Sequence, residues 1–488
     1  MLGRSFIGAR WVEGFGERFV SENPATGEIL WEGCGANLEQ IHKAMHAAKA
    51  AFPAWAAYSM EERIEYLERF CEALKADREG LAKTISKETG KPLWESDAEV
   101  GAMINKLPIS IEAYQDRCKS LRVETSSGIS ITRHKPYGVM VVLGPFNFPG
   151  HLPHGHIIPA LLAGNTVVFK PSELTPLVAE RIFVCWEKAK LPSGVIQLVQ
   201  GGKEVGKILS EHAELNGLMF TGSFRIGHQL AKIFSDRPDK ILALEMGGNN
   251  PLVVHAVRDL KAAAYHVIQS AYLTTGQRCT CARRLIVTRG WEGERFVEAL
   301  IQLISKIKIG PYTDQPEPFM GPLISNAAAE RVIEAYELLI HEGAQSLVPC
   351  KRLYDQRPFL SPSLLDITSI KAHMDEEIFG PLLQLIWVNN FEEAIVECNK
   401  TAYGLAAGLL CDQEDLYSIF LREVRAGVIN WNRPLTGASS HAPFGGIGHS
   451  GNHRPSAYYA ADYCAYPVAS LEEKNLKLPP KLSPGIPE

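Results

Sequence analysis

The chain is 488 residues long, which exceeds one compact core and fits two or three domains. Hydrophobic residues make up 46% and charged residues 22%, a balance typical of a soluble globular enzyme rather than of a disordered or fibrous chain. The formal net charge of -5 is mild, and Lys and Arg are spread along the chain, so we expect no binding to nucleic acid.

The amino-terminal segment shows no basic stretch followed by an apolar core, and no apolar run approaches the roughly 18 residues that a membrane span requires. We therefore expect no membrane association and a cytoplasmic protein. Ten cysteines are dispersed without the regular framework of small secreted proteins, so free thiols are expected. Cys279-Thr280-Cys281 could be a redox or metal-binding pair or two ordinary thiols, and C-x-C alone is a weak signal for the former.

Between about residues 40 and 90, apolar side chains recur at helical spacing, which predicts helices that flank a sheet. One face carries Ile41, Ala44, Ala47 and Ala48, and a later one carries Ile64, Leu67, Phe70 and Leu74. The segment Leu121–Thr132 breaks this pattern and predicts a hairpin around Ser126-Ser127-Gly128.

From residue 139 to 245, short β-type runs alternate with helical stretches, which predicts a parallel sheet with helices on both faces. The predicted strands are Val139–Leu143, Thr166–Phe169, Val195–Val199, Leu218–Phe220 and Ile241–Leu244. The predicted helices are Ile157–Ala163, closed by Gly164-Asn165, and Leu174–Lys190, which ends before Pro192.

A second alternating region begins at residue 251 and predicts another α/β unit. Its predicted elements are the strand Pro251–Val254, the helix Asp259–Thr274, the strand Leu285–Val287 and the helix Glu294–Lys306. Near the carboxyl end, Tyr463–Val468 is, like Leu121–Thr132, a β-type segment that does not fit the alternation of strands and helices. Exposed strand edges of this kind can pair with another subunit. The proline-rich tail Pro479–Glu488 is expected to be a loosely packed end.

One thiol and one carboxylate suggest the chemistry. Cys279 follows a glycine turn in Thr275-Gly276-Gln277-Arg278-Cys279, downstream of Leu244-Glu245-Met246-Gly247-Gly248. Covalent oxidation of an aldehyde needs a soft nucleophile that adds to the carbonyl, and a base that later drives water onto the acyl group. Cys279 and Glu245 are candidates for these two tasks.

Seven motifs, taken in order, resemble those of the aldehyde dehydrogenase superfamily, and the resemblance covers essentially the whole chain. They are Gly144-Pro-Phe-Asn-Phe-Pro149, Lys170-Pro-Ser-Glu173, Phe220-Thr-Gly-Ser223, Leu244-Glu-Met-Gly-Gly248, Gly276-Gln-Arg-Cys279, Glu376-Glu-Ile-Phe-Gly-Pro381 and Pro443-Phe-Gly-Gly446. The resemblance implies an α/β fold with two doubly wound parallel-sheet domains and a small β oligomerisation element. Residues 1–112 and 134–247 would bind NAD, residues 248–452 would form the catalytic domain, and residues 113–133 and 453–488 would form the oligomerisation element of a homodimer or a dimer of dimers.

The same resemblance implies that Cys279 is the nucleophile, that Glu245 activates the deacylating water, and that Asn147 completes an oxyanion hole. A side-chain amide paired with a backbone N–H would stabilise the charge that develops on the carbonyl oxygen. Without the resemblance, the residues alone favour a turn residue between two prolines for Asn147 and a buried inert thiol for Cys279.

Cofactor binding is implied at two places. At the first, Lys170 and Glu173 would hold the adenosine ribose, and a carboxylate there favours NAD over NADP. The turn after the strand Leu218–Phe220 would meet the pyrophosphate through Gly222, Ser223, Phe224, Arg225, Ile226 and Gly227, although the family's usual threonine is Phe224 here. At the second, Glu377 and Phe379 would hold the nicotinamide ribose and pack beside the ring.

The substrate end is more specific than the superfamily. Residues 430–459 resemble the branch that oxidises a semialdehyde bearing two carboxylates in arginine breakdown. Such a pocket should supply guanidinium, hydroxyl or imidazole donors. The candidates are Arg278, Arg433, Ser439, Ser440 and His441.

Other interpretations stay open. The acyl group could pass to coenzyme A, although relatives that do so usually lack the glutamate at position 245. A cofactor-free cysteine hydrolase would leave the dinucleotide motifs unexplained, and an inactive binding protein with this fold would be expected to lack a catalytic residue. His151, His154 and His156 could suggest a metal, but the flanking prolines and the following apolar helix favour packing, so no metal is expected.

Overall fold

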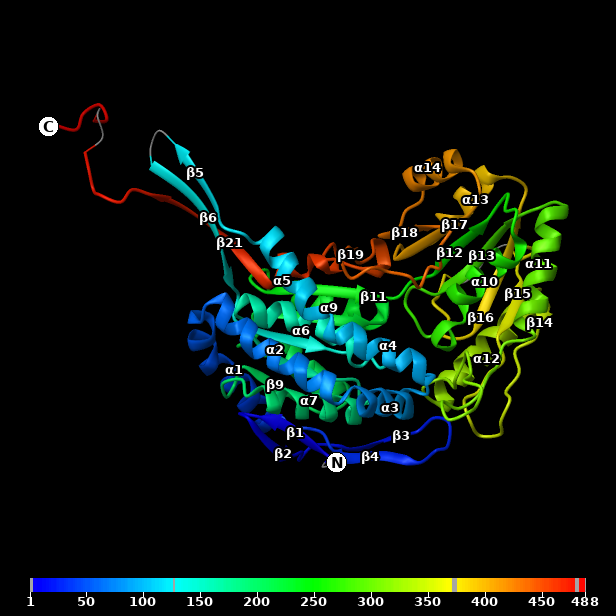
Figure 1. Cartoon of the computed structure of the whole chain (residues 1–488), viewed down its shortest axis with the longest axis horizontal. Helices are drawn as coiled ribbons and strands as arrows, with labels where there is room; N and C mark the ends of the chain where they lie inside the picture. The colour runs from blue at the N-terminus through cyan, green and yellow to red at the C-terminus, as the bar shows by residue number, and fades with distance from the viewer. Residues whose placement is uncertain (1–2, 126–127, 371–374, 479–481, 488) are drawn as a thin grey trace.

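Two seven-stranded sheets form the two lobes of the molecule in the computed structural model, which describes residues 3–125, 128–370, 375–478 and 482–487 (Figure 1). The hairpin tip at Ser126-Ser127 and residues 479–481 and 488 of the tail, both subjects of a prediction, lie outside the described residues. No helix in these ranges is long and apolar enough to cross a membrane.

The first sheet has the strand order β11-β10-β7-β8-β9-β1-β2. Its strands are β1 (Arg4–Ile7), β2 (Arg10–Glu13), β7 (Val139–Leu143), β8 (Thr166–Lys170), β9 (Ile196–Leu198), β10 (Gly217–Gly222) and β11 (Ile241–Met246). Strands β7 to β11 are parallel, which confirms the predicted strands, and the order reverses between β7 and β10. The edge hairpin β1–β2 was not predicted, and neither was the separate hairpin of β3 (Arg18–Glu22) and β4 (Ile29–Cys34).

Helices cover both faces of this sheet because its strands are apolar on both sides. They are α1 (Leu38–Ala57), α2 (Met60–Ala76), α3 (Arg78–Thr89), α4 (Leu93–Ile104), α5 (Lys106–Arg117), α6 (His151–Ala163), α7 (Pro176–Ala189), α8 (Lys203–Glu211) and α9 (Phe224–Phe234). Alternate residues of β7 enter different cores: Met140 packs with the α2, α6 and α7 side, and Val141 with the α1, α8 and α9 side.

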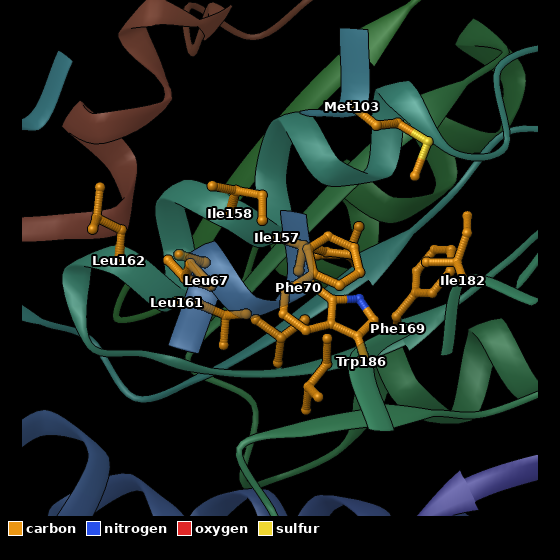
Figure 2. Close-up of a cluster of buried hydrophobic side chains, with 14 of the residues drawn as sticks. Leu67, Phe70, Met103, Ile157, Ile158, Leu161, Leu162, Phe169, Ile182 and Trp186 are labelled. Atoms are coloured by element: carbon orange, nitrogen blue, oxygen red, sulfur yellow. The ribbon is translucent and has the colours of Figure 1, made fainter. Parts of the chain in front are cut away.

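The core under α6 is filled by large apolar side chains (Figure 2). Phe70 of α2 and Trp186 of α7 stack with ring centroids 3.5 Å apart, and the ring of His154 stacks on Phe70 at 5.3 Å. Burial of one such side chain stabilises the fold by about 1.5–3 kcal/mol. Since α6 is anchored this firmly, the loop that precedes it holds a fixed position.

The second sheet has the order β14-β15-β16-β13-β12-β17-β18 and is parallel except at β14. Its strands are β12 (Asn250–Val254), β13 (Ala282–Thr288), β14 (Gln345–Val348), β15 (Ser363–Asp366), β16 (Leu382–Val388), β17 (Ala406–Leu410) and β18 (Val428–Trp431). Its helices are α10 (Leu260–Ala271), α11 (Trp291–Ile304), α12 (Asn326–His341), α13 (Phe391–Cys398) and α14 (Glu414–Glu423). The second predicted α/β unit is thus confirmed.

Three predicted bounds were wrong for physical reasons. The helix predicted to reach Thr274 ends at Ala271, because Thr274 and Thr275 adopt left-handed backbone conformations. The helix predicted to start at Ile157 begins at His151, since its prolines Pro153 and Pro159 are accommodated within it. Tyr463 lies in the short helix α15 (Ala461–Cys464), and the terminal strand β21 runs from Ala465 to Glu472.

A three-stranded antiparallel sheet projects away from both lobes (Figure 1). It joins β5 (Leu121–Thr125), β6 (Gly128–Pro136) and β21, with β6 in the centre. All five residues of β5 are exposed, including Leu121 and Val123. Within the part of the chain that the structure describes, β5 and β21 each pair only with β6, so each has an unpaired edge. The remaining short elements are β19 (Pro443–Phe444), β20 (Ser456–Ala457), η1 (Leu273–Gly276), η2 (Gly448–Ser450) and η3 (Tyr458–Ala460).

Candidate active site

A cavity of about 1590 Å³ lies at the carboxyl ends of the parallel strands of the first sheet. The ends of β7, β8, β10 and β11 line it, and so does the loop that carries Cys279. This is the position at which doubly wound sheets bind ligands, beside the reversal of strand order between β7 and β10. Its volume exceeds that of a usual drug-sized pocket, about 300–1000 Å³, and suits a dinucleotide together with a substrate.

The loop before Cys279 has an unusual backbone. Thr274 and Thr275 have φ values of 55° and 56°, and Gly276 has φ +73°. A β-branched residue in the left-handed region costs on the order of 1–3 kcal/mol. A Cβ at Gly276 would lie 2.2 Å from the carbonyl oxygen of Gly380, so only glycine fits there.

Buried polar contacts hold this loop in place. Glu95 of α4 accepts a bond from the backbone N–H of Thr274 at 3.2 Å and another from its hydroxyl. The Arg278 guanidinium forms an ion pair with Glu95 at 2.9 Å and donates to Thr274 Oγ1 at 2.7 Å. Thr275 donates its hydroxyl proton to the carbonyl of Gly321 at 2.9 Å. The strain of the loop is thereby compensated by contacts to α4 of the first lobe and to Gly321 of the second.

The three predicted catalytic residues line the same cavity. Asn147 is buried, and its Nδ2 donates to the carbonyl of Gln277 at 2.9 Å, two residues before Cys279. Glu245 lies on β11, where its Oε1 accepts the backbone N–H of Ser456 at 3.1 Å. Glu245 Oε2 is buried and has no hydrogen-bond partner among the described residues.

Burial has the largest effect on the pKa values of Cys279 and Glu245. It raises the pKa of the Cys279 thiol above its ordinary value, and the carboxylates of Glu377 and Glu245 raise it further. Burial also raises the pKa of Glu245 well above its ordinary range, although the N–H of Ser456 opposes this. Both groups therefore hold their protons more tightly than they would in water.

The residues predicted for the cofactor, except Gly227, line the same cavity. Lys170 is buried and lies 3.6 Å from Glu173, whose side chain is 49% exposed. Helix α9 begins at the cavity wall, where Ser223 caps it by accepting the N–H of Ile226 at 3.5 Å. The positive end of this helix suits a pyrophosphate.

Close packing keeps the start of α9 in position. A Cβ on Gly227 would lie 2.3 Å from Met246 Sδ, so the glycine lets the helix approach β11. Phe224 stacks on His449 with ring centroids 3.8 Å apart, and both line the cavity. The substitution of the family's threonine by Phe224 is thus accommodated by an aromatic partner from the carboxyl-terminal region.

At the other end, Glu377 and Phe379 face the cavity beside the nucleophile loop. Glu377 accepts the N–H of Gly248 at 3.2 Å and lies 3.8 Å from Arg283, and burial raises its pKa to about 7. The fully buried Arg283 donates to the carbonyls of Gly276 at 2.7 Å and Gly380 at 3.3 Å. Arg283 therefore connects the nucleophile loop to the loop of Glu377 and Phe379.

The comparisons with known proteins agree with this arrangement. A model of the aldehyde dehydrogenase family matches residues 11–467. The chain belongs to this family. A similar protein, the N-succinylglutamate 5-semialdehyde dehydrogenase of Pseudomonas fluorescens strain Pf0-1, is 53% identical over 481 residues, which cover 99% of both chains. The predicted family, fold class and enzyme class are thus confirmed.

Two solved structures resemble the enzyme at lower identity. An indole-3-acetaldehyde dehydrogenase in complex with NAD+ is 28% identical, with a TM-score of 0.89 over 96% of each chain. The NADP-dependent glyceraldehyde-3-phosphate dehydrogenase of Bacillus halodurans C-125, complexed with NADP, is 26% identical, with a TM-score of 0.90 over 97% of this chain and 99% of that one. Enzymes with this fold thus bind either NAD or NADP, so the fold does not determine the cofactor.

None of the residues predicted for the substrate is among the described residues that line this cavity. Arg278 pairs with Glu95 as described above, and its role in substrate binding stays a prediction. Arg433 is exposed and close enough to His266 of α10 to lower the pKa of that imidazole, after burial. Ser439, Ser440 and His441 form a loop against α5, where His441 Nδ1 lies 3.4 Å from Glu112.

Sequence reasoning missed Glu95, Arg283 and His449. The strongest available signal was an arginine pair, Arg283-Arg284, inside the otherwise apolar strand β13, because a buried guanidinium needs several acceptors. Two of the three histidines of α6 make buried polar contacts: His154 Nδ1 contacts the carbonyl of Gly150 at 2.7 Å, and His156 Nδ1 contacts the Tyr463 hydroxyl at 2.8 Å.

Proposed function

We propose that the enzyme oxidises N-succinylglutamate 5-semialdehyde to N-succinylglutamate with NAD, in the breakdown of arginine by succinylation. The observation that carries this proposal is the arrangement of Cys279, Glu245 and Asn147 around one cavity in a chain 53% identical, over 99% of both lengths, to an enzyme of that name. The absence of a required residue would have supported an inactive binding protein instead.

The proposed reaction follows from the residues. Cys279 Sγ loses its thiol proton to water and adds as a thiolate to the aldehyde carbon. Asn147 Nδ2 stabilises the negative charge on the carbonyl oxygen with its second N–H, since the first bonds to Gln277. NAD, when bound, supplies the hydride acceptor. The acyl group then remains on Cys279 as a thioester, and Glu245 takes a proton from the water that hydrolyses it. The product is a carboxylate, and coenzyme A is not required.

For the cofactor, we propose that Lys170 and Glu173 bind the adenosine ribose, that residues 222–227 bind the pyrophosphate, and that Glu377 and Phe379 position the nicotinamide end. Glu173 supports NAD, because its carboxylate would repel a 2'-phosphate. Lys203 and Lys207 of α8 also line the cavity and would attract that phosphate, so NADP is the alternative to test.

We also propose the domain roles and the assembly. Residues 1–112 and 134–247 would bind NAD, residues 248–452 would carry the nucleophile, and residues 113–133 and 453–488 would mediate assembly into a homodimer or a dimer of dimers. The unpaired edges of β5 and β21 and the exposed Leu121 and Val123 support this, because such edges pair readily with a second copy.

The test is an initial-rate assay of NADH formation without coenzyme A. We expect the highest kcat/KM with N-succinylglutamate 5-semialdehyde and NAD, compared with glutamate and succinate semialdehydes and with NADP. Cys279→Ala should abolish the activity, whereas Cys350→Ala, which removes another partly exposed thiol, should retain it. A preference for a different carboxylated semialdehyde would favour the second candidate function, a related dehydrogenase with another substrate.

A further inference from the structure

Lys106, the first residue of α5, is a buried cation without a matching anion. It is 3% exposed, and the hydrogen bond that the structure gives its ammonium group is a long one, to Ser440 Oγ at 3.4 Å. Among the described residues, no carboxylate lies within ion-pair distance of its Nζ. A buried ammonium is costly unless an acceptor or an opposite charge compensates it.

The neighbours of Lys106 do not provide that charge. Burial lowers the pKa of Lys106 to about 8. Its charge in turn lowers the pKa values of His151, His154 and His156 on α6, in addition to the larger effect of burial. His151 Nδ1 is buried without a hydrogen-bond partner among the described residues. Lys106 therefore lies beside α6 and Ser440 with a hydroxyl as its acceptor and, among the described residues, no carboxylate partner.

The segments around Lys106 continue into the lining of the reaction cavity at two points. Leu152, the residue after His151, lines the cavity together with Cys279. Phe444, at the end of the loop that carries Ser440, lines it as well. Ser440 is partly exposed, and its hydroxyl contacts the ammonium group, so a ligand that binds at Ser440 lies next to Lys106 Nζ.

We propose that Lys106 Nζ and Ser440 Oγ bind a carboxylate of the substrate, and that this contact gives the enzyme its preference for carboxylated aldehydes. The inference rests on the proposed function, since it assumes a carboxylated substrate. It assigns to Lys106 the role first predicted for Arg278 and Arg433. The guanidinium of Arg278 is already neutralised by Glu95, and Arg433 is exposed beside His266 of α10.

The variant Lys106→Met tests this, because it keeps the length of the side chain and removes its charge. We expect kcat/KM for N-succinylglutamate 5-semialdehyde to fall about 10- to 100-fold, mainly through KM, as for the loss of a charge-assisted bond. Activity on butanal, which has no carboxylate, should stay unchanged. Lys119→Met is the matched control: it removes an exposed lysine just after the same helix and should alter neither activity. Ser440→Ala should lower kcat/KM less, by roughly 2- to 10-fold.

A third substrate shows which carboxylate is bound. N-acetylglutamate 5-semialdehyde retains the carboxylate nearer the aldehyde and lacks the distal one. If Lys106→Met lowers its kcat/KM as strongly, the nearer carboxylate meets Lys106; if the variant leaves it unchanged, the distal one does. Either result supports the proposal.

A binding measurement separates this role from a structural one. Without ligand, the Tm of Lys106→Met should equal or exceed that of the wild type, because a buried charge without an anion has been removed. N-succinylglutamate should raise the Tm of the wild type and of Lys119→Met but not that of Lys106→Met. Equal losses on butanal and on the succinylated aldehyde, or no loss on either, would overturn the proposal.

The outcome for the proposed function can be separated from this result. If the wild type prefers another carboxylated aldehyde and Lys106→Met loses that preference, the substrate assignment is wrong and the Lys106 site stands. If the wild type prefers the succinylated aldehyde and Lys106→Met retains this preference, the function stands and the site is wrong.

Discussion

Arg278→Met should expose how much the strained nucleophile loop depends on its buried ion pair. The Glu95 carboxylate is completely buried and the Arg278 side chain is 19% exposed. Removing one partner of a buried pair leaves the other charge uncompensated, which costs about 3–5 kcal/mol. Glu95 still accepts the N–H and hydroxyl of Thr274, so the expected loss is nearer to about 3 kcal/mol.

The double variant Glu95→Gln, Arg278→Met gives the decisive comparison. Glutamine keeps an acceptor for the Thr274 N–H and carries no charge, so the double variant should be more stable than Arg278→Met alone by about 1–2 kcal/mol. The assay is the urea midpoint together with the Tm, at one protein concentration because assembly affects both. An Arg278→Met enzyme as stable as the wild type, or a double variant less stable than the single one, would refute the reasoning.

Three further outcomes follow from the site. Glu245→Gln should give one rapid equivalent of NADH followed by turnover roughly 10²–10⁴-fold slower, because the thioester forms but no base activates water. Since burial raises the pKa of Glu245, the wild-type rate should increase as pH rises through that raised pKa. A stopped-flow pH series should show that this increase is absent in the variant. Asn147→Ala should lower kcat about 10²–10³-fold in steady-state assays through the loss of an oxyanion donor, and a loss below about threefold would remove it from that role. Glu173→Gln should raise the NADP-to-NAD ratio of kcat/KM roughly fivefold, a modest change because the carboxylate is half exposed, whereas Glu204→Gln on the outer face of α8 should leave the ratio unaltered.

The sequence predicted the parallel strands well because both of their faces are buried. Runs such as Val139–Leu143 are apolar throughout, which is the pattern of a covered parallel sheet. The hairpin β1–β2 escaped prediction because its strands are four residues long and its turn is made by Gly8 and Ala9, both with positive φ. An alanine in that conformation gives no signal in the sequence.

The limits of prediction at the site have a different cause. Motif order predicted which residues gather around the cavity, since their positions depend on strand ends. It did not predict that Glu95 would meet Arg278, or that Lys106 would be buried. Charged residues on an amphipathic helix are ordinarily assigned to solvent, and only the tertiary packing of α4 and α5 against α6 shows that these two are enclosed.

Arg283 also constrains how such an enzyme can diverge. Its guanidinium holds the carbonyls of Gly276 and Gly380 at once, and no other side chain offers five donors in so flat an arrangement. A change in the length of either loop would leave some of these buried N–H donors without acceptors. Replacing the nucleophile loop with that of a relative should therefore succeed only when the 377–380 segment is replaced with it. The two segments must change together although about a hundred residues separate them.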